Sequence, residues 1–256
     1  MLNPPSSHHF EPIVTPELDR SSLHLWFLDL EGASTLSIDV HMKCLSCEEQ
    51  VRAQRFSHAA SQRAFIMTRS HLRRLLGSYQ GIEPEAVDLT INTHGKPHLS
   101  RTRENQGLVF NVSHSGAMAV LVFGWDTMLG IDVECLRPRR DLARLAEYGL
   151  SETELAQWRR LSSAHRDESF IRYWNAKEAF VKATGRGIAV GLKKVVIAAD
   201  FQGFHQVPEG FEPACNWILH TGEIEDFRYA VVHEKPRRNI RLLRNEQENP
   251  AINREE

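Results

Sequence analysis

The sequence is poor in cysteine and has neither a long apolar run nor an excess of charge of one sign. Four cysteines in 256 residues are too few for a disulfide framework in a chain of this length. The longest nearly apolar run, residues 117–125, is too short to cross a bilayer. Residues 1–11 carry neither the basic nor the apolar segment of a secretory signal. These absences predict a cytoplasmic protein with no membrane partner.

Charge is nearly balanced, with 31 Lys and Arg against 33 Asp and Glu and a net charge of -2. A chain without a basic excess has no general attraction to nucleic acid, so we expect no such partner and only a local anion site. Cys44 and Cys47 have C-x-x-C spacing, but no second pair and no thioredoxin-like context accompanies them. A zinc or redox site at these cysteines is therefore a disfavoured alternative.

Hydrophobic periodicity predicts an α+β fold. Helices are expected over residues 48–56, 60–76, 155–161 and 167–184. Gly77 is expected to end the second of these helices and Gly185 the fourth. Strands are expected over residues 23–30, 87–93, 108–112, 117–123, 128–134, 193–198, 215–220 and 227–233. The tail from residue 237 onward is expected to fray. This order indicates two similar halves, residues 1–124 and 125–256.

The most informative feature is a pair of carboxylates, Asp132 and Glu134, in the apolar segment 130–134 (GIDVE). Because side chains alternate across a strand, both carboxylates project to one face and Val133 projects to the other. At about 4 Å and an effective dielectric near 20, two like charges repel by about 4 kcal/mol. A divalent cation with oxygen ligands, or a raised pKa, would relieve this repulsion. The alternative is a solvated edge with surface acids.

A downstream helix adds Glu178 and Lys182, one turn apart and at the border of an apolar stripe that includes Trp174. Such a pair is usually a weak surface salt bridge, but Trp174 limits its solvation. Three carboxylates and a lysine at these positions suit a divalent cation held against a polyphosphate.

Segment 110–116 (FNVSHSG) ends a strand with hydroxyls, an imidazole and a glycine. Ser113, His114 and the backbone N–H groups of such a turn can face a phosphate, although ordinary turn chemistry explains the same residues. A serine nucleophile is poorly supported, because neighbours on a strand point apart and no G-x-S-x-G elbow is present.

Four segments in this order, 95–97 (GKP), 110–115 (FNVSHS), 130–134 (GIDVE) and 174–182 (WNAKEAFVK), resemble the motif set of the 4'-phosphopantetheinyl transferase superfamily. The resemblance is to the long, surfactin-synthetase-activating type and covers roughly residues 45–190. It implies two α+β halves related by a pseudo-twofold axis, with the active site between them. It also implies transfer of the 4'-phosphopantetheine arm of coenzyme A to a serine of an apo acyl or peptidyl carrier protein, releasing adenosine 3',5'-bisphosphate. A monomer is expected.

By the same resemblance, Asp132, Glu134 and Glu178 would ligate Mg²⁺, and Lys182 would contact the phosphate and protonate the leaving oxygen. The catalytic residues are then Asp132, Glu178 and Lys182. The nucleotide end of coenzyme A would be held by Arg63, Lys96, Pro97, Ser113, His114 and Lys182. Lys177 would lie beside the metal site. Either Glu178 or a metal-bound water would take the proton of the acceptor serine.

Some positions keep two interpretations. Asn175 stands where the family usually has Ser or Thr, and Arg52 and Arg55 are either coenzyme A contacts or a solvated helix face. Arg137, Arg139 and Arg140 are either a basic patch for acidic carriers or solvated loop arginines, and the second interpretation is favoured. A non-catalytic module that binds coenzyme A or a carrier protein is the alternative function. A metal-dependent nuclease is disfavoured, because no lysine closely follows Glu134 and the net charge is negative.

Overall fold

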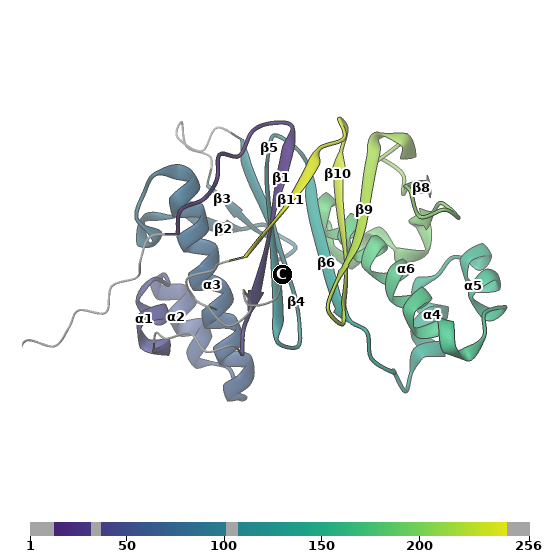
Figure 1. Ribbon diagram of the computed structural model, residues 1–256, viewed down its shortest axis with the longest axis horizontal. Coiled ribbons are helices and arrows are strands. Elements are labelled where there is room, and N and C mark those ends of the chain that lie inside the picture. Colours follow the sequence, from purple (N-terminus) through teal and green to yellow (C-terminus); the bar gives the residue numbers. More distant parts are fainter. Residues whose placement is uncertain (1–12, 32–36, 101–106, 245–256) are drawn as a thin grey trace, which may run out of the picture. The chain divides into compact units, whose positions relative to one another are not determined.

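The computed structural model describes residues 13–31, 37–100 and 107–244, which fall into two compact units (Figure 1). The first unit comprises the described parts of Met1–Glu17, Phe27–Asp88 and Arg244–Glu256. The second comprises Leu18–Trp26 and the described parts of Leu89–Leu243. The division falls within strand β1 (Ser22–Asp29).

The first unit is mainly helical. Its elements are α1 (Ile38–Lys43), α2 (Cys47–Gln54), α3 (Ala59–Gln80) and the short 3-10 helix η1 (Pro84–Ala86). The prediction that α3 ends at Gly77 is wrong. A Cβ at Gly77 would lie 2.6 Å from the carbonyl oxygen of Ile82, so this glycine permits a close approach of the chain. The helix ends instead at Gly81, which has the left-handed φ of 67° that favours glycine.

The second unit contains two larger sheets. One has the order β11-β1-β5-β4 and the other the order β6-β10-β9. Their further strands are β4 (Leu108–Ser115), β5 (Met118–Trp125), β6 (Leu129–Cys135), β9 (Trp217–Ile224), β10 (Phe227–Glu234) and β11 (Asn239–Arg244). The prediction of a frayed tail is therefore wrong for residues 239–244, which pair beside β1. Residues 245–256 lie outside the described residues.

Helix α6 (Ser163–Thr184) packs on β6 and β10 (Figure 1). Its apolar side chains join those of the sheet in one buried core that includes Phe180, Trp217 and Val232. As predicted, Gly185 ends the helix, with a φ of 66°. Two shorter helices precede α6, namely α4 (Leu142–Gly149) and α5 (Glu152–Arg159).

Small elements complete the second unit. The hairpin of β2 (Leu89–Ile91) and β3 (Pro97–Leu99) precedes β4, and β7 (Val196–Ile197) pairs with β8 (Phe204–Gln206). The remaining 3-10 helices are η2 (Gly187–Val190), η3 (Leu192–Lys194) and η4 (Ala214–Asn216). Of the strand predicted over residues 193–198, only Val196 and Ile197 are extended, as β7, and the first two residues belong to helix η3.

The predicted α+β class is confirmed. The pseudo-twofold relation and the boundary after residue 124 stay predictions. Among the described helices, none combines the length and the apolar character needed to span a bilayer.

Candidate functional site

The carboxylates of β6 face helix α6. Asp132 and Glu134 share this face with Gly130, where a Cβ would lie 2.0 Å from the carbonyl oxygen of Ala179. Only glycine fits there, so Gly130 lets α6 lie close to the carboxylate strand. The alternate residues Ile131 and Val133 are buried. The predicted separation of apolar and acidic faces is confirmed.

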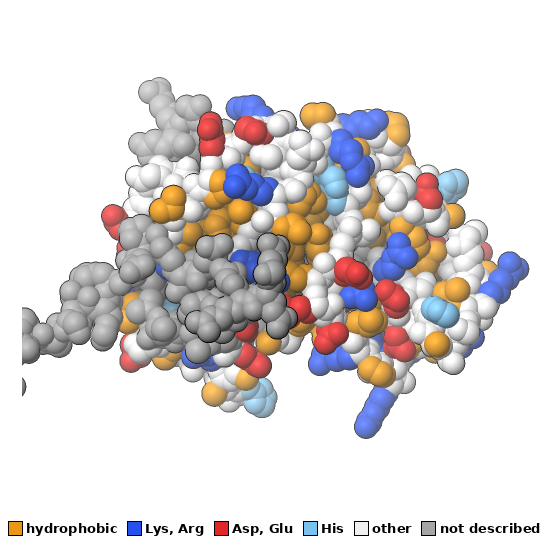
Figure 2. All heavy atoms as spheres, in the orientation of Figure 1, with side chains coloured by type: hydrophobic (Ala, Val, Ile, Leu, Met, Phe, Trp, Pro, Cys, Tyr) orange, Lys and Arg blue, Asp and Glu red, His pale blue; other side chains and the backbone are white. Residues whose placement is uncertain are grey.

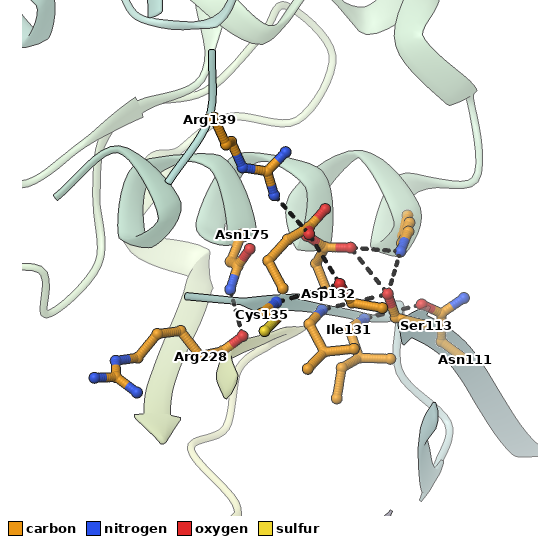
Figure 3. Close-up of polar contacts among 12 residues, drawn as sticks. Asn111, Ser113, Ile131, Asp132, Cys135, Arg139, Asn175 and Arg228 are labelled. Carbon is orange, nitrogen blue, oxygen red and sulfur yellow. Dashed lines mark hydrogen bonds and ion pairs between the residues drawn. The ribbon is translucent and has the colours of Figure 1, made fainter. Parts of the chain in front are cut away.

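Asp132 forms an ion pair with Lys182 of α6, at 2.7 Å between Oδ1 and Nζ (Figure 3). The Ser113 hydroxyl donates to the same carboxylate oxygen at 3.0 Å and accepts from Lys182 at 2.8 Å. Asp132 is only 5% exposed, and its Oδ2 is a buried atom with no hydrogen-bond partner within the described ranges. Burial raises the pKa of Asp132, while Lys182 and Ser113 lower it; burial is the larger effect.

Glu178 lies one helical turn before Lys182 and is partly buried. Burial raises the pKa of Glu178, and the negative charges of Asp132 and Glu134 raise it further, while Lys182 opposes them. The charges of Asp132 and Glu134 therefore act on Glu178. In the described part of the chain, however, no three acidic, histidine or cysteine side chains converge closely enough to hold a metal ion.

Two of these carboxylates form ion pairs with basic side chains. Lys182 occupies one oxygen of Asp132, and the Arg139 Nη2 lies 2.7 Å from Oε2 of Glu134. The Ser115 hydroxyl donates to that same Glu134 oxygen at 3.0 Å. Arg139 was predicted as part of a surface patch with Arg137 and Arg140; the structure instead directs it onto Glu134.

Strand β4 binds the edge of β6 through side chains. Asn111 Oδ1 accepts from the backbone N–H of Ile131 at 2.9 Å. The hydroxyls of Ser113 and Ser115 accept from the next two alternate N–H groups of β6, at 3.3 and 3.2 Å. Asn111 and Ser115 had no predicted role, although the polar residues at every second position of the segment were a signal of one shared face.

The hydroxyl of Ser113 is thus fully engaged within the protein, with one donated and two accepted hydrogen bonds. His114 projects to the opposite, exposed side of β4. Arg63 lies on α3 in the first unit and is partly buried.

Lys96 fixes the β2-β3 hairpin to the end of α6. Its ammonium donates to the backbone oxygens of Leu129 at 2.9 Å, Lys182 at 2.6 Å and Ala183 at 3.4 Å. Asn92 supports this contact by donating to the backbone oxygen of Gly185 at 3.0 Å. Burial lowers the pKa of Lys96 to about 8. All three N–H bonds of the ammonium are therefore directed at backbone oxygens.

A cavity of about 260 Å³ opens beside this contact. Its lining includes Lys96, Pro97, Glu178 and Lys182. Four predicted site residues from distant parts of the sequence thus share one cavity.

Lys177 does not lie beside the carboxylates, and that prediction is wrong. It is fully buried, and its ammonium pairs with Glu154 at 2.7 Å and donates to the backbone oxygens of Leu192 and Val195. Glu154 in turn accepts from the backbone N–H groups of Ser151 and Ile197. Lys177 therefore joins α6 to the start of α5 and to the segment that leads into β7.

Charge on the surface is mixed. On the face of the molecule in Figure 2, acidic and basic side chains are interspersed over β9, β10 and the neighbouring helices. Among the described residues visible there, no single basic stripe of the kind that tracks nucleic acid is seen.

Comparisons with known proteins agree with one another. Residues 128–232 match the family model of the 4'-phosphopantetheinyl transferase superfamily, and residues 33–124 match the model of the N-terminal part of 4'-phosphopantetheinyl transferase. The chain is 38% identical over 176 residues to 4'-phosphopantetheinyl transferase HetI of Nostoc sp., covering 69% of this chain and 73% of the relative. It is 25% identical over 203 residues to a 4'-phosphopantetheinyl transferase of Bacillus subtilis, covering 77% and 86%. It is 28% identical over 195 residues to 4'-phosphopantetheinyl transferase psf-1 of Bacillus pumilus, covering 75% and 80%.

Proposed function

Because the chain belongs to the 4'-phosphopantetheinyl transferase superfamily, we propose that it transfers the phosphopantetheine arm of coenzyme A to a serine of an apo carrier protein. The observation that supports this most is the shared cavity, which is lined by Glu178 and Lys182 together with Lys96 and Pro97. A cavity that joins a carboxylate and a cation suits a reaction in which a proton is accepted and a phosphate is held.

We further propose that Asp132, Glu134 and Glu178, which do not converge closely enough for a metal ion in the described structure, come together around Mg²⁺ when it binds. Carboxylate oxygens are the ligands that this hard cation prefers, and the buried, unpartnered Oδ2 of Asp132 is an available donor atom. When bound, the ion would neutralise charge on the phosphates of coenzyme A. Arg63, Pro97 and His114 are the proposed contacts of the nucleotide end. Lys96 and Ser113, whose polar atoms are engaged within the protein, act by holding α6 and Asp132 in place.

The reaction needs no covalent nucleophile on this chain. The serine oxygen of the carrier attacks the phosphorus that bears the pantetheine arm, and the bond from that phosphorus to the leaving adenosine 3',5'-bisphosphate breaks. Glu178, whose pKa is raised by burial and by its acidic neighbours, accepts the serine proton. Lys182 stabilises the charge that develops on the leaving oxygen.

Incubation of the purified protein with Mg²⁺, coenzyme A and several apo acyl and peptidyl carriers tests the proposal. The expected result is a carrier whose mass increases by one phosphopantetheine group. Binding of coenzyme A without any mass increase on any carrier would favour the non-catalytic binding module. The carrier panel also identifies the physiological class of acceptor.

A further inference from the structure

The proposed reaction gives no role to the ion pair between Arg139 and Glu134. The two side chains are 22% and 23% exposed, and their contact is 2.7 Å long. Arg139 and Ser115 both donate to Oε2 of Glu134. Among the described residues, the neighbouring Arg137 and Arg140 form no ion pair, so the contact is particular to Arg139.

Two buried polar atoms near this pair have no partner within the described residues. One is the Nε donor of Arg139 and the other is the Oδ1 acceptor of Asn175. Asn175 donates through Nδ2 to the backbone oxygen of Arg228 at 2.6 Å, and Arg228 is the cross-strand partner of Glu134. In Figure 3, the Asn175 oxygen points to the side of β6 on which Arg139 lies. A buried donor and a buried acceptor, each unsatisfied, thus flank Glu134.

We propose that Arg139 is a resident counter-ion of Glu134 that competes with the divalent cation, and that Asn175 accepts the guanidinium when the cation takes its place. This inference rests on the proposed function, because it assumes that Glu134 is a metal ligand. A guanidinium and a divalent ion repel each other and compete for the same carboxylate. Arg139 therefore lowers the affinity of the site for the cation.

The same contact has a benefit in the metal-free protein. Three interacting carboxylates repel one another, and Lys182 and Arg139 each neutralise one of them. When the cation has displaced Arg139, the neutral amide oxygen of Asn175 accepts the guanidinium and does not attract the cation away from Glu134.

Direct Mn²⁺ binding, measured by electron paramagnetic resonance on the full chain without coenzyme A, tests the competition. Arg139→Gln removes the charge, and Arg140→Gln removes a charge from an exposed neighbour in the same loop. We expect about tenfold tighter Mn²⁺ binding for Arg139→Gln and a change below about twofold for the control. Equal affinities of the two variants, or weaker binding by Arg139→Gln, would overturn the proposal.

A double-mutant cycle tests the part played by Asn175. Asn175→Ala is expected to weaken Mn²⁺ binding about threefold when Arg139 is present, because the displaced guanidinium loses its acceptor. In the Arg139→Gln background the same change is expected to have no effect. An equal effect in both backgrounds would show that Asn175 does not act as the acceptor of the Arg139 guanidinium.

The outcomes also separate this inference from the proposed function. If the wild-type protein makes holo carrier while Arg139→Gln binds Mn²⁺ no more tightly, this inference alone is rejected. A wild type that makes no holo carrier rejects the proposed function instead.

Discussion

Asp132 combines deep burial with a single basic partner. Lys182 reaches one of its oxygens, and the other has no partner among the described residues. A buried carboxylate with a free oxygen is unfavourable in a protein of purely structural design. A ligand that supplies the missing partner would offset the free energy lost by burying this oxygen, which is why we place the reaction at Asp132.

Removal of either interacting acid tests that assignment. We expect Asp132→Ala and Glu178→Gln each to lower kcat for phosphopantetheine transfer by at least about 1000-fold, because a cation ligand or the proton acceptor is lost. The fold should survive, since neither change opens a large cavity; circular dichroism and the thermal midpoint measure this. Glu168→Gln, on the same helix but at its more exposed Arg228 pair, is the matched control. Retained transfer in both site variants would disprove the assigned roles.

At the scale of elements, helix α6 carries the chemistry and two lysines set its position. Lys177 joins its middle to α5, and Lys96 joins its end to the β2-β3 hairpin. Glu178 and Lys182 lie between these two contacts. The geometry of the cavity therefore depends on how firmly the hairpin holds the last turn of the helix.

Lys96→Met tests the hairpin contact, because it keeps the length of the side chain and removes its three donors. We expect a loss of about 1–3 kcal/mol in the free energy of unfolding, since three backbone oxygens lose their partner. The KM for coenzyme A should rise about tenfold as the cavity wall moves. Urea unfolding and steady-state kinetics measure the two effects, with the exposed Lys193→Met as control. An unchanged KM together with unchanged stability would show that Lys96 positions nothing.

Most elements were predictable because their signals are local. The periodicity of α6 and the glycine after it each lie within a few residues of the feature they specify. Strand β11 was missed because its partner, β1, lies about two hundred residues earlier in the sequence. The end of α3 was misplaced because Gly77 serves a contact with residues that follow the helix.

The site was predictable in its acids and less so in its partners. Spacing placed Asp132 and Glu134 on one face of their strand, because the strand period is fixed. That Glu178 joins them was implied only by the resemblance to the family. Spacing did not give the direction of long basic side chains. Lys177 was expected at the acids and pairs with Glu154, and Arg139 was expected at the surface and pairs with Glu134. Rotamers of such residues depend on tertiary packing, which no spacing encodes.

At the scale of the whole molecule, three histidines make the free energy of unfolding depend on pH. His24 and His233 are fully buried, and the Nε2 atoms of His220 and His233 lie 3.1 Å apart. Burial is the main cause that lowers the pKa of each to about 4. Between pH 6.5 and 4 the unfolded chain therefore binds protons that the folded protein does not, and the free energy of unfolding falls as the pH falls.

Urea unfolding at pH 7 and pH 5 measures this dependence. We expect the free energy of unfolding to fall by about 1 kcal/mol per buried histidine between these pH values, after allowance for solvent screening. His220→Gln should make the fall smaller by a similar amount. The exposed His205→Gln is expected to leave it unchanged. A fall of the same size in wild type and His220→Gln would contradict the link.

The side-chain bonds from β4 to β6 have a consequence for how this protein can vary. A backbone ladder between two strands is built from groups that every residue possesses, so substitution hardly alters it. Here the joint between two sheets consists of one amide and two hydroxyls, and one of those hydroxyls also touches Asp132. A single substitution at Ser113 can therefore weaken the contact between β4 and β6 and also move the Asp132 carboxylate. Stability and activity are expected to change together at this position.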